Sequence, residues 1–222
     1  MGNRSAAAPA TVPMLPVVHD RSPLVRLRRR LLVEPPAVTL PTAPPREDLL
    51  GAACAECARQ GTCCCEVAEG EKLATLSFRD VRRIEEASGL AEHRFVEREE
   101  LDPLERLAYE TFRPLYRGLF VGNVRLGLKP RRGACVFLER GRGCRLPPEA
   151  KPLACRLYPF DYNLAGELTL VDAPHCLAIN EACSERELLR MFGTSRRQLR
   201  ALRKQTLEEA AEHARLLRHR AG

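Results

Sequence analysis

Ten cysteines constrain this chain more than any other feature of its 222 residues. Half of them fall within twelve residues, because the pair Cys54 and Cys57 is closely followed by the run Cys63-Cys64-Cys65. A single buried cysteine packs much like any small apolar side chain, so packing alone does not explain such clustering. Thiolates select soft metals, and the pattern therefore indicates zinc, iron or an iron–sulfur cluster.

A disulfide framework is the main alternative for an even number of cysteines. Such frameworks are typical of short secreted chains that begin with a signal peptide. Residues 1–50 lack the uninterrupted apolar stretch that export requires, because Pro13, Pro16 and other prolines break each apolar run. Adjacent cysteines also pair poorly with each other, since disulfide geometry strains the peptide between them. We therefore expect metal ligation in a cytoplasmic protein.

The spacing of the first group favours a chelate. The two residues between Cys54 and Cys57 form a tight turn that brings both sulfurs to one metal at about 2.3 Å. Cys63 and Cys64 are adjacent, so their side chains point in different directions. They serve two metals or two corners of a cluster more naturally than one ion. Cys65 is then a spare thiol.

The second group is spread over the middle of the chain. A hairpin would present Cys135 and Cys144 from neighbouring strands, and a short helical turn would bring Cys155 to the same site. Cys176 follows a further hairpin and is expected to join them. Arg156 lies directly after a candidate ligand, where it could donate to sulfur and temper the charge of the thiolates.

Two residues near this group keep open roles. His175 is interpreted as a surface histidine, with metal ligation as the alternative, because thiolates already suffice for a soft metal. Cys183 lies close to a helix start, where the helix dipole favours a thiolate. The predicted metal ligands are Cys54, Cys57, Cys63, Cys64, Cys135, Cys144, Cys155 and Cys176.

Composition divides the chain into three parts. Residues 1–50 carry nine of the seventeen prolines and no long periodic stretch, so we expect a disordered arm. Residues 51–183 hold all the cysteines and form the expected metal-binding domain. Residues 184–222 form a basic helical tail whose narrow apolar stripe packs on that domain. No run of about 18 apolar residues occurs, so no membrane span is expected.

The domain is expected to be α+β, with short helices, β-hairpins, a long C-terminal helix and a metal that stabilises it. Ser77 and Asp80 predict a capped helix over about 78–88 that stops at Gly89. A second helix covers about 103–117, where Pro114 kinks or shortens it. The other expected elements are a strand at 121–128, hairpins over 135–146 and 161–172, a helical turn at about 150–157 and helices from 184 and from about 195 to 219.

Charge is unevenly spread along the chain, whose net charge is +7. Residues 113–160 carry eleven basic and two acidic side chains, and residues 184–222 carry ten and five. In the first stretch the excess is best explained by basic groups that offset nearby thiolates. No aromatic-rich or helix-turn-helix pattern accompanies the charge, so nucleic acid is not the favoured partner. A protein partner for the basic tail remains open.

Six separated segments within about residues 54–183 carry a resemblance to a known family. They are Cys54-Ala-Glu-Cys57, Arg59-Gln-Gly-Thr-Cys-Cys64, 76–84 (LSFRDVRRI), Cys135-Val-Phe-Leu138, Gly143-Cys144 and 151–160 (KPLACRLYPF). Together they resemble the YkgJ-like cysteine cluster proteins, a family also named for its CxxCxxCC motif and described as zinc- or iron-chelating domains. Lys151 stands where that family usually has arginine, and five residues separate Cys57 from Cys63, more than in the family's named motif.

The resemblance implies metal binding, and a related branch of flagellin lysine N-methylases makes methyl transfer an alternative. This sequence contains neither a Cys-x3-Cys-x2-Cys radical motif nor a strand–glycine-loop–helix signature for an adenosyl cofactor. Three functions are therefore compared: a protein that binds a metal ion or iron–sulfur cluster, a cluster-dependent enzyme, and a metal-stabilised interaction module. The first is favoured, and whether the protein is an enzyme is left open.

Overall fold

The structure is a computed structural model, and it describes residues 17–18, 57, 73–139, 141–171, 173 and 176–221. Helices and small antiparallel sheets alternate in these ranges, so the expected α+β class is confirmed. The helices are α2 (Phe78–Ser88), α3 (Pro103–Phe112), α4 (Leu153–Leu157), α5 (Leu177–Glu181), α6 (Glu185–Met191) and α7 (Arg196–Ala221), with the 3-10 turns η3 (Glu92–Arg94) and η4 (Pro114–Tyr116).

The strands form two three-stranded sheets, in the orders β2-β4-β3 and β1-β10-β9, and two separate hairpins, β5-β6 and β7-β8. Each neighbouring pair is antiparallel except β1 and β10, which run parallel. The strands are β1 (Val17–Val18), β2 (Val96–Glu100), β3 (Phe120–Val121), β4 (Val124–Leu128), β5 (Pro130–Arg131), β6 (Ala134–Cys135), β7 (Leu138–Glu139), β8 (Gly143–Cys144), β9 (Phe160–Tyr162) and β10 (Leu168–Val171).

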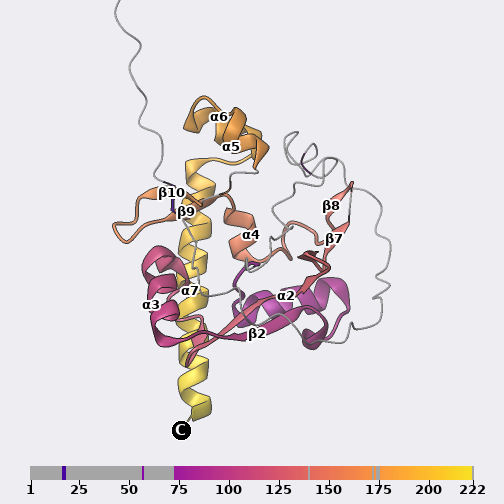
Figure 1. The fold of residues 1–222 in the computed structure, drawn as a ribbon, viewed down its shortest axis with the longest axis vertical. Coiled ribbons are helices and arrows are strands. Elements are labelled where there is room, and N and C mark those ends of the chain that lie inside the picture. Colours follow the sequence, from indigo (N-terminus) through magenta and orange to yellow (C-terminus); the bar gives the residue numbers. More distant parts are fainter. Residues whose placement is uncertain are drawn as a thin grey trace, which may run out of the picture.

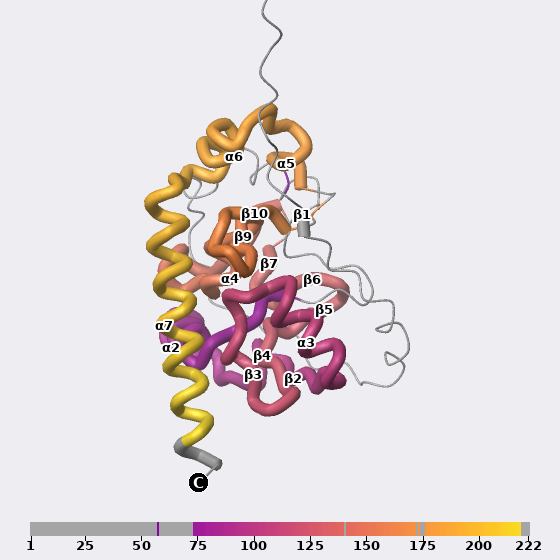
Figure 2. Tube along the Cα trace, turned by 90° about the vertical axis from the view of Figure 1, so that its left-hand side faces the viewer, coloured from indigo at the N-terminus to yellow at the C-terminus, as the bar shows by residue number. Residues whose placement is uncertain are grey.

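Helix α7 runs along one side of the described part of the molecule and spans most of its long dimension (Figures 1 and 2). Contacts join it to η4, α4, α2 and β3, so elements far apart in the sequence meet on one helix. Leu199 and Ala210 on its inner face are almost fully buried. Helix α7 thus packs through its inner face on elements from the preceding described residues. None of the described helices is both long enough and apolar enough to cross a membrane.

Local signals explain where α2 begins and ends. The Ser77 hydroxyl accepts from the Asp80 backbone N–H at 2.9 Å, and the Asp80 carboxylate accepts from the Ser77 N–H at 2.9 Å. This reciprocal capping box satisfies two N–H groups that the first turn would otherwise leave unpaired. Gly89, at φ 67°, ends the helix and donates its N–H to the Glu85 carbonyl at 2.8 Å.

The buried apolar side chains form two clusters. The first lies between α2, β4 and the hairpins that carry Cys135 and Cys144, and includes Leu76, Ile84 and Phe137. The second joins η4, β9 and β10 to α5, α6 and α7. Helix α4 contributes to both, because Cys155 packs on the first cluster while Leu157 is buried in the second. This short helix therefore links the two halves of the core.

Pro114 shortens the predicted helix 103–117: α3 ends at Phe112 and is followed by η4, because Pro114 cannot donate the next helical hydrogen bond. Residues 1–50 were expected to lack regular structure, yet Val17–Val18 pairs with Leu170 and Val171 of β10. Two β-branched residues that follow a proline are suited to an extended edge strand.

Gly118 follows η4 and lies where the backbone closely approaches α7. Its φ is 86°, and a Cβ there would lie 3.2 Å from the Ala210 carbonyl oxygen of α7. Gly122 is also at positive φ, 61°, but a Cβ there would meet nothing within 4 Å. Alanine at either position costs backbone strain of about 1–3 kcal/mol. We predict that Gly118→Ala lowers the free energy of unfolding, measured in urea, by at least about 1 kcal/mol more than Gly122→Ala does. Equal losses would contradict the close contact.

Candidate metal centre

Three of the predicted ligands are brought to the same part of the core. Cys135 is on β6, Cys144 on β8 and Cys155 on α4. Cys135 is buried within the apolar cluster that includes Phe137, and the other two pack against that cluster. Burial raises the pKa of the Cys155 thiol well above its usual value, and the neighbouring Cys135 and Cys144 raise it further. Three elements thus deliver three thiols to one neighbourhood.

A hairpin was predicted over 135–146, with Cys135 and Cys144 on neighbouring strands. Antiparallel hairpins do form in this region, but the strands pair differently. Cys144 pairs with Leu138 across β7 and β8, whereas Cys135 pairs with Pro130 across β5 and β6. The sequence therefore folds into two tight hairpins rather than the single one expected, and the two cysteines are not cross-strand neighbours. A turn at Arg132 and Gly133, both with positive φ, closes the first hairpin, and this pattern suits a two-residue hairpin loop.

Of the remaining seven cysteines, the structure describes Cys57, Cys176 and Cys183. Cys57 is buried, while Cys183 is exposed. Cys176 precedes α5 and is buried in the second apolar cluster, with Leu157 and Phe160. No disulfide joins any two of the six described cysteines to each other. The predicted ligands Cys54, Cys63 and Cys64, the spare Cys65 and His175 lie outside the described residues.

The donor chemistry suits zinc or iron, because thiolate sulfur is what these metals prefer among protein ligands. Within the described ranges, however, no group of three or more His, Cys, Asp or Glu side chains could hold a metal ion. Cys135, Cys144 and Cys155 thus lie near one another without forming a metal-holding group among the described residues.

Two basic side chains, Lys151 and Arg156, lie close to Cys155 in the sequence. Lys151 favours the charged form of the Cys155 thiol and so partly opposes the effect of burial on its pKa. Arg156 is half-buried, and its charged neighbours include Arg83, Asp80, Glu209 and Glu149. Burial lowers the pKa of Arg156, and the positive charge of Arg83 lowers it further. Arg156 thus faces a buried polar cluster that adjoins the cysteines.

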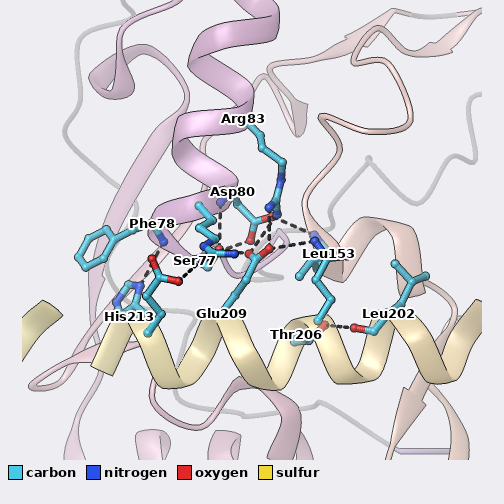
Figure 3. Close-up of polar contacts among 12 residues, drawn as sticks. Ser77, Phe78, Asp80, Arg83, Leu153, Leu202, Thr206, Glu209 and His213 are labelled. Atoms are coloured by element: carbon cyan, nitrogen blue, oxygen red, sulfur yellow. Dashed lines mark hydrogen bonds and ion pairs between the residues drawn. The ribbon is translucent and has the colours of Figure 1, made fainter. Parts of the chain in front are cut away.

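That cluster joins α2 to α7 and is shown in Figure 3. Arg83 donates to Asp80 at 2.5 Å and to both carboxylate oxygens of Glu209, at 2.6 and 3.1 Å. The Ser77 hydroxyl donates to Glu209 at 2.7 Å, and Gln205 donates to it at 3.0 Å. Burial alone would raise the pKa of Glu209, but the hydrogen bonds and the charge of Arg83 outweigh it and lower the pKa. Glu209 is therefore a buried carboxylate held in its charged form.

Sequence reasoning missed this cluster, although a signal for it exists. The apolar stripe of α7 continues past Leu199 and Leu202 into Thr206, Glu209 and His213 at spacings of three and four residues. Four of these five side chains are almost fully buried, namely Leu199, Thr206, Glu209 and His213. Polar residues in register with an apolar stripe indicate a buried network rather than a solvent-exposed face.

Three comparisons address what this centre is similar to. No protein-family model, curated protein or solved structure matches the chain. The relation to YkgJ-like cysteine cluster proteins stays a prediction that rests on the sequence motifs.

His213 provides a test of the α2–α7 contact by pH. Its Nδ1 accepts from the Phe78 N–H at 3.2 Å, its ring stacks on Phe78 at 3.8 Å, and its buried Nε2 has no hydrogen-bond partner among the described residues. Burial lowers the pKa of His213 from 6.5 to about 4. Between these values the unfolded chain takes up a proton that the folded chain does not, so acid destabilises the fold through this residue.

We predict that His213→Asn, which keeps an acceptor for the Phe78 N–H, flattens the acid loss of stability between pH 6.5 and 4. The free energy of unfolding of the wild type should fall by roughly 1–3 kcal/mol more than that of the variant over this range. Urea titrations at several pH values measure this difference, and contributions from Asp80 and other shared carboxyl groups cancel in it. The exposed His93 gives the control variant His93→Asn, which should retain the wild-type slope. Identical slopes for all three proteins would contradict the buried, neutral histidine.

Proposed function

We propose that this protein binds a zinc or iron ion, or an iron–sulfur cluster, through clustered cysteine thiolates. Cys135, Cys144 and Cys155 supply part of the ligand set. The cysteines of the first group, Cys54, Cys57, Cys63 and Cys64, supply the rest, and Cys176 is the additional candidate. A bound ion would hold the surrounding loops together, and a cluster would add the capacity to transfer electrons.

One observation carries this proposal: three cysteines from three separate elements share one apolar neighbourhood. In this neighbourhood burial, together with nearby Cys135 and Cys144, raises the pKa of the Cys155 thiol and so disfavours its deprotonation. A metal cation reverses this effect, since it binds the deprotonated form of every ligand. The hairpins β5-β6 and β7-β8 are very short and contribute few large apolar side chains, so they gain most from such a link.

The residues around the thiols have defined parts in this proposal. Lys151 offsets thiolate charge from the turn before α4. Phe137 and Leu146, both buried beside Cys135 and Cys144, keep water from the sulfurs. The cysteines themselves lie at strand and helix positions rather than in long loops, so the backbone limits their movement.

Metal content tests the proposal directly. After anaerobic purification, the wild-type protein should carry zinc or iron in a fixed ratio to the chain, and acid-labile sulfide should accompany iron if a cluster is present. We predict that Cys155→Ser loses most of this metal. Cys183→Ser should retain the wild-type content, because Cys183 is exposed and lies apart from the Cys135, Cys144 and Cys155 group. A folded Cys155→Ser protein with unchanged metal content would refute the assignment of Cys155.

A further inference from the structure

Helix α4, which carries Cys155, has no N-terminal capping side chain of its own. It has five residues, fewer than the length at which an isolated helix is stable in water. Its N-cap is Pro152, whose side chain offers no acceptor to the first N–H groups of the helix. The Leu153 N–H is therefore an unpaired donor in a buried position unless another element supplies an acceptor.

Asp80 on α2 supplies that acceptor. Its Oδ1 atom accepts from the Leu153 N–H at 3.0 Å, although 73 positions separate the two residues (Figure 3). Both residues are about 2% exposed, so water cannot replace this bond without opening the core. A negative charge at the start of a helix also interacts favourably with the helix dipole. Asp80 thus caps two helices, α2 through its own capping box and α4 through space.

The Asp80 carboxylate is itself held from several sides. Its Oδ2 accepts from the Ser77 N–H at 2.9 Å, and its Oδ1 accepts from Arg83 at 2.5 Å. Arg83 is in turn fixed by Glu209 of α7. The carboxylate therefore has little freedom to rotate, and the position of the first turn of α4 is determined by α2 and α7 rather than by α4 itself.

We propose that Asp80 is a positioning residue for the metal centre. Its hydrogen bond to Leu153 sets the place of the turn that presents Cys155 to Cys135 and Cys144. This inference rests on the proposed function, because it concerns the geometry of the thiol ligands. Loss of the bond should let α4 shift at its N-terminal end, so the Cys155 sulfur would no longer meet the metal at the distance that thiolate ligation requires.

Asp161 offers a matched control. It is also a buried carboxylate, it accepts from Arg113 at 2.8 Å, and it accepts from the Tyr162 backbone N–H at 2.8 Å. No hydrogen bond in the described residues links Asp161 to α4. Asp80→Asn and Asp161→Asn therefore remove the same kind of interaction, but only the first touches the helix that carries Cys155.

The experiment titrates Co²⁺ into the metal-free wild type and both variants under anaerobic conditions, at a temperature where circular dichroism shows all three folded. The thiolate-to-cobalt charge-transfer band reports ligation, and a competing chelator gives the affinity. We expect Asp80→Asn to weaken Co²⁺ binding by about 10–100-fold and to lower the charge-transfer intensity per bound ion. Asp161→Asn should reduce the melting temperature but leave the affinity and the band unchanged.

The outcomes separate this inference from the proposed function. A wild type without a charge-transfer band would overturn both. A wild type with the band, together with equal affinities for the two variants, would overturn the role of Asp80 alone. If Asp80→Asn does not fold, Glu209→Gln weakens the same network one step further from Leu153 and should give a smaller loss of affinity in the same direction. An unchanged affinity in a folded Glu209→Gln protein would then decide against the inference.

Discussion

The charged cluster of Asp80, Arg83 and Glu209 is the contact on which the arrangement of this fold depends. The carboxylates of Asp80 and Glu209 are almost fully buried and have lost their hydration. Hydrogen bonds and the charge of Arg83 must replace the lost contacts with water. Removing one member of such a cluster leaves an uncompensated charge and typically costs about 3–5 kcal/mol. The same cluster fixes α7 against α2 and, through the Leu153 N–H, fixes α4 against both. Stability and the placement of the cysteines are therefore determined together.

Elements with strong local signals could be predicted from the sequence. The helix expected at about 78–88 is α2, because Ser77 and Gly89 give clear start and stop signals. The hairpin expected at 161–172 is β9-β10, with Gly166 at φ 78° in its turn. The long C-terminal helix also follows its periodic pattern. In each case the deciding interactions lie within a few residues of one another.

Features that depend on distant contacts could not be predicted in the same way. The division of 130–144 into two hairpins depends on a turn at Arg132, a residue type that local rules do not place at positive φ. The burial of Glu209 depends on Arg83, 126 positions away, and a sequence pattern alone does not reveal that pairing. Cys135, Cys144 and Cys155 lie beside one apolar cluster, but through two hairpins and not through the single hairpin that the sequence predicted. The part that Cys54, Cys63 and Cys64 play lies outside the described residues.

X-ray absorption at the metal edge of the purified wild-type protein tests the central claim most directly, because it identifies the atoms that touch the metal. If cysteines from both groups form one centre, the first shell should consist of sulfur at about 2.3 Å, with three or four sulfur atoms per metal. A first shell of nitrogen and oxygen at about 2.0–2.2 Å without sulfur, or a protein purified anaerobically without any metal, would contradict a thiolate centre.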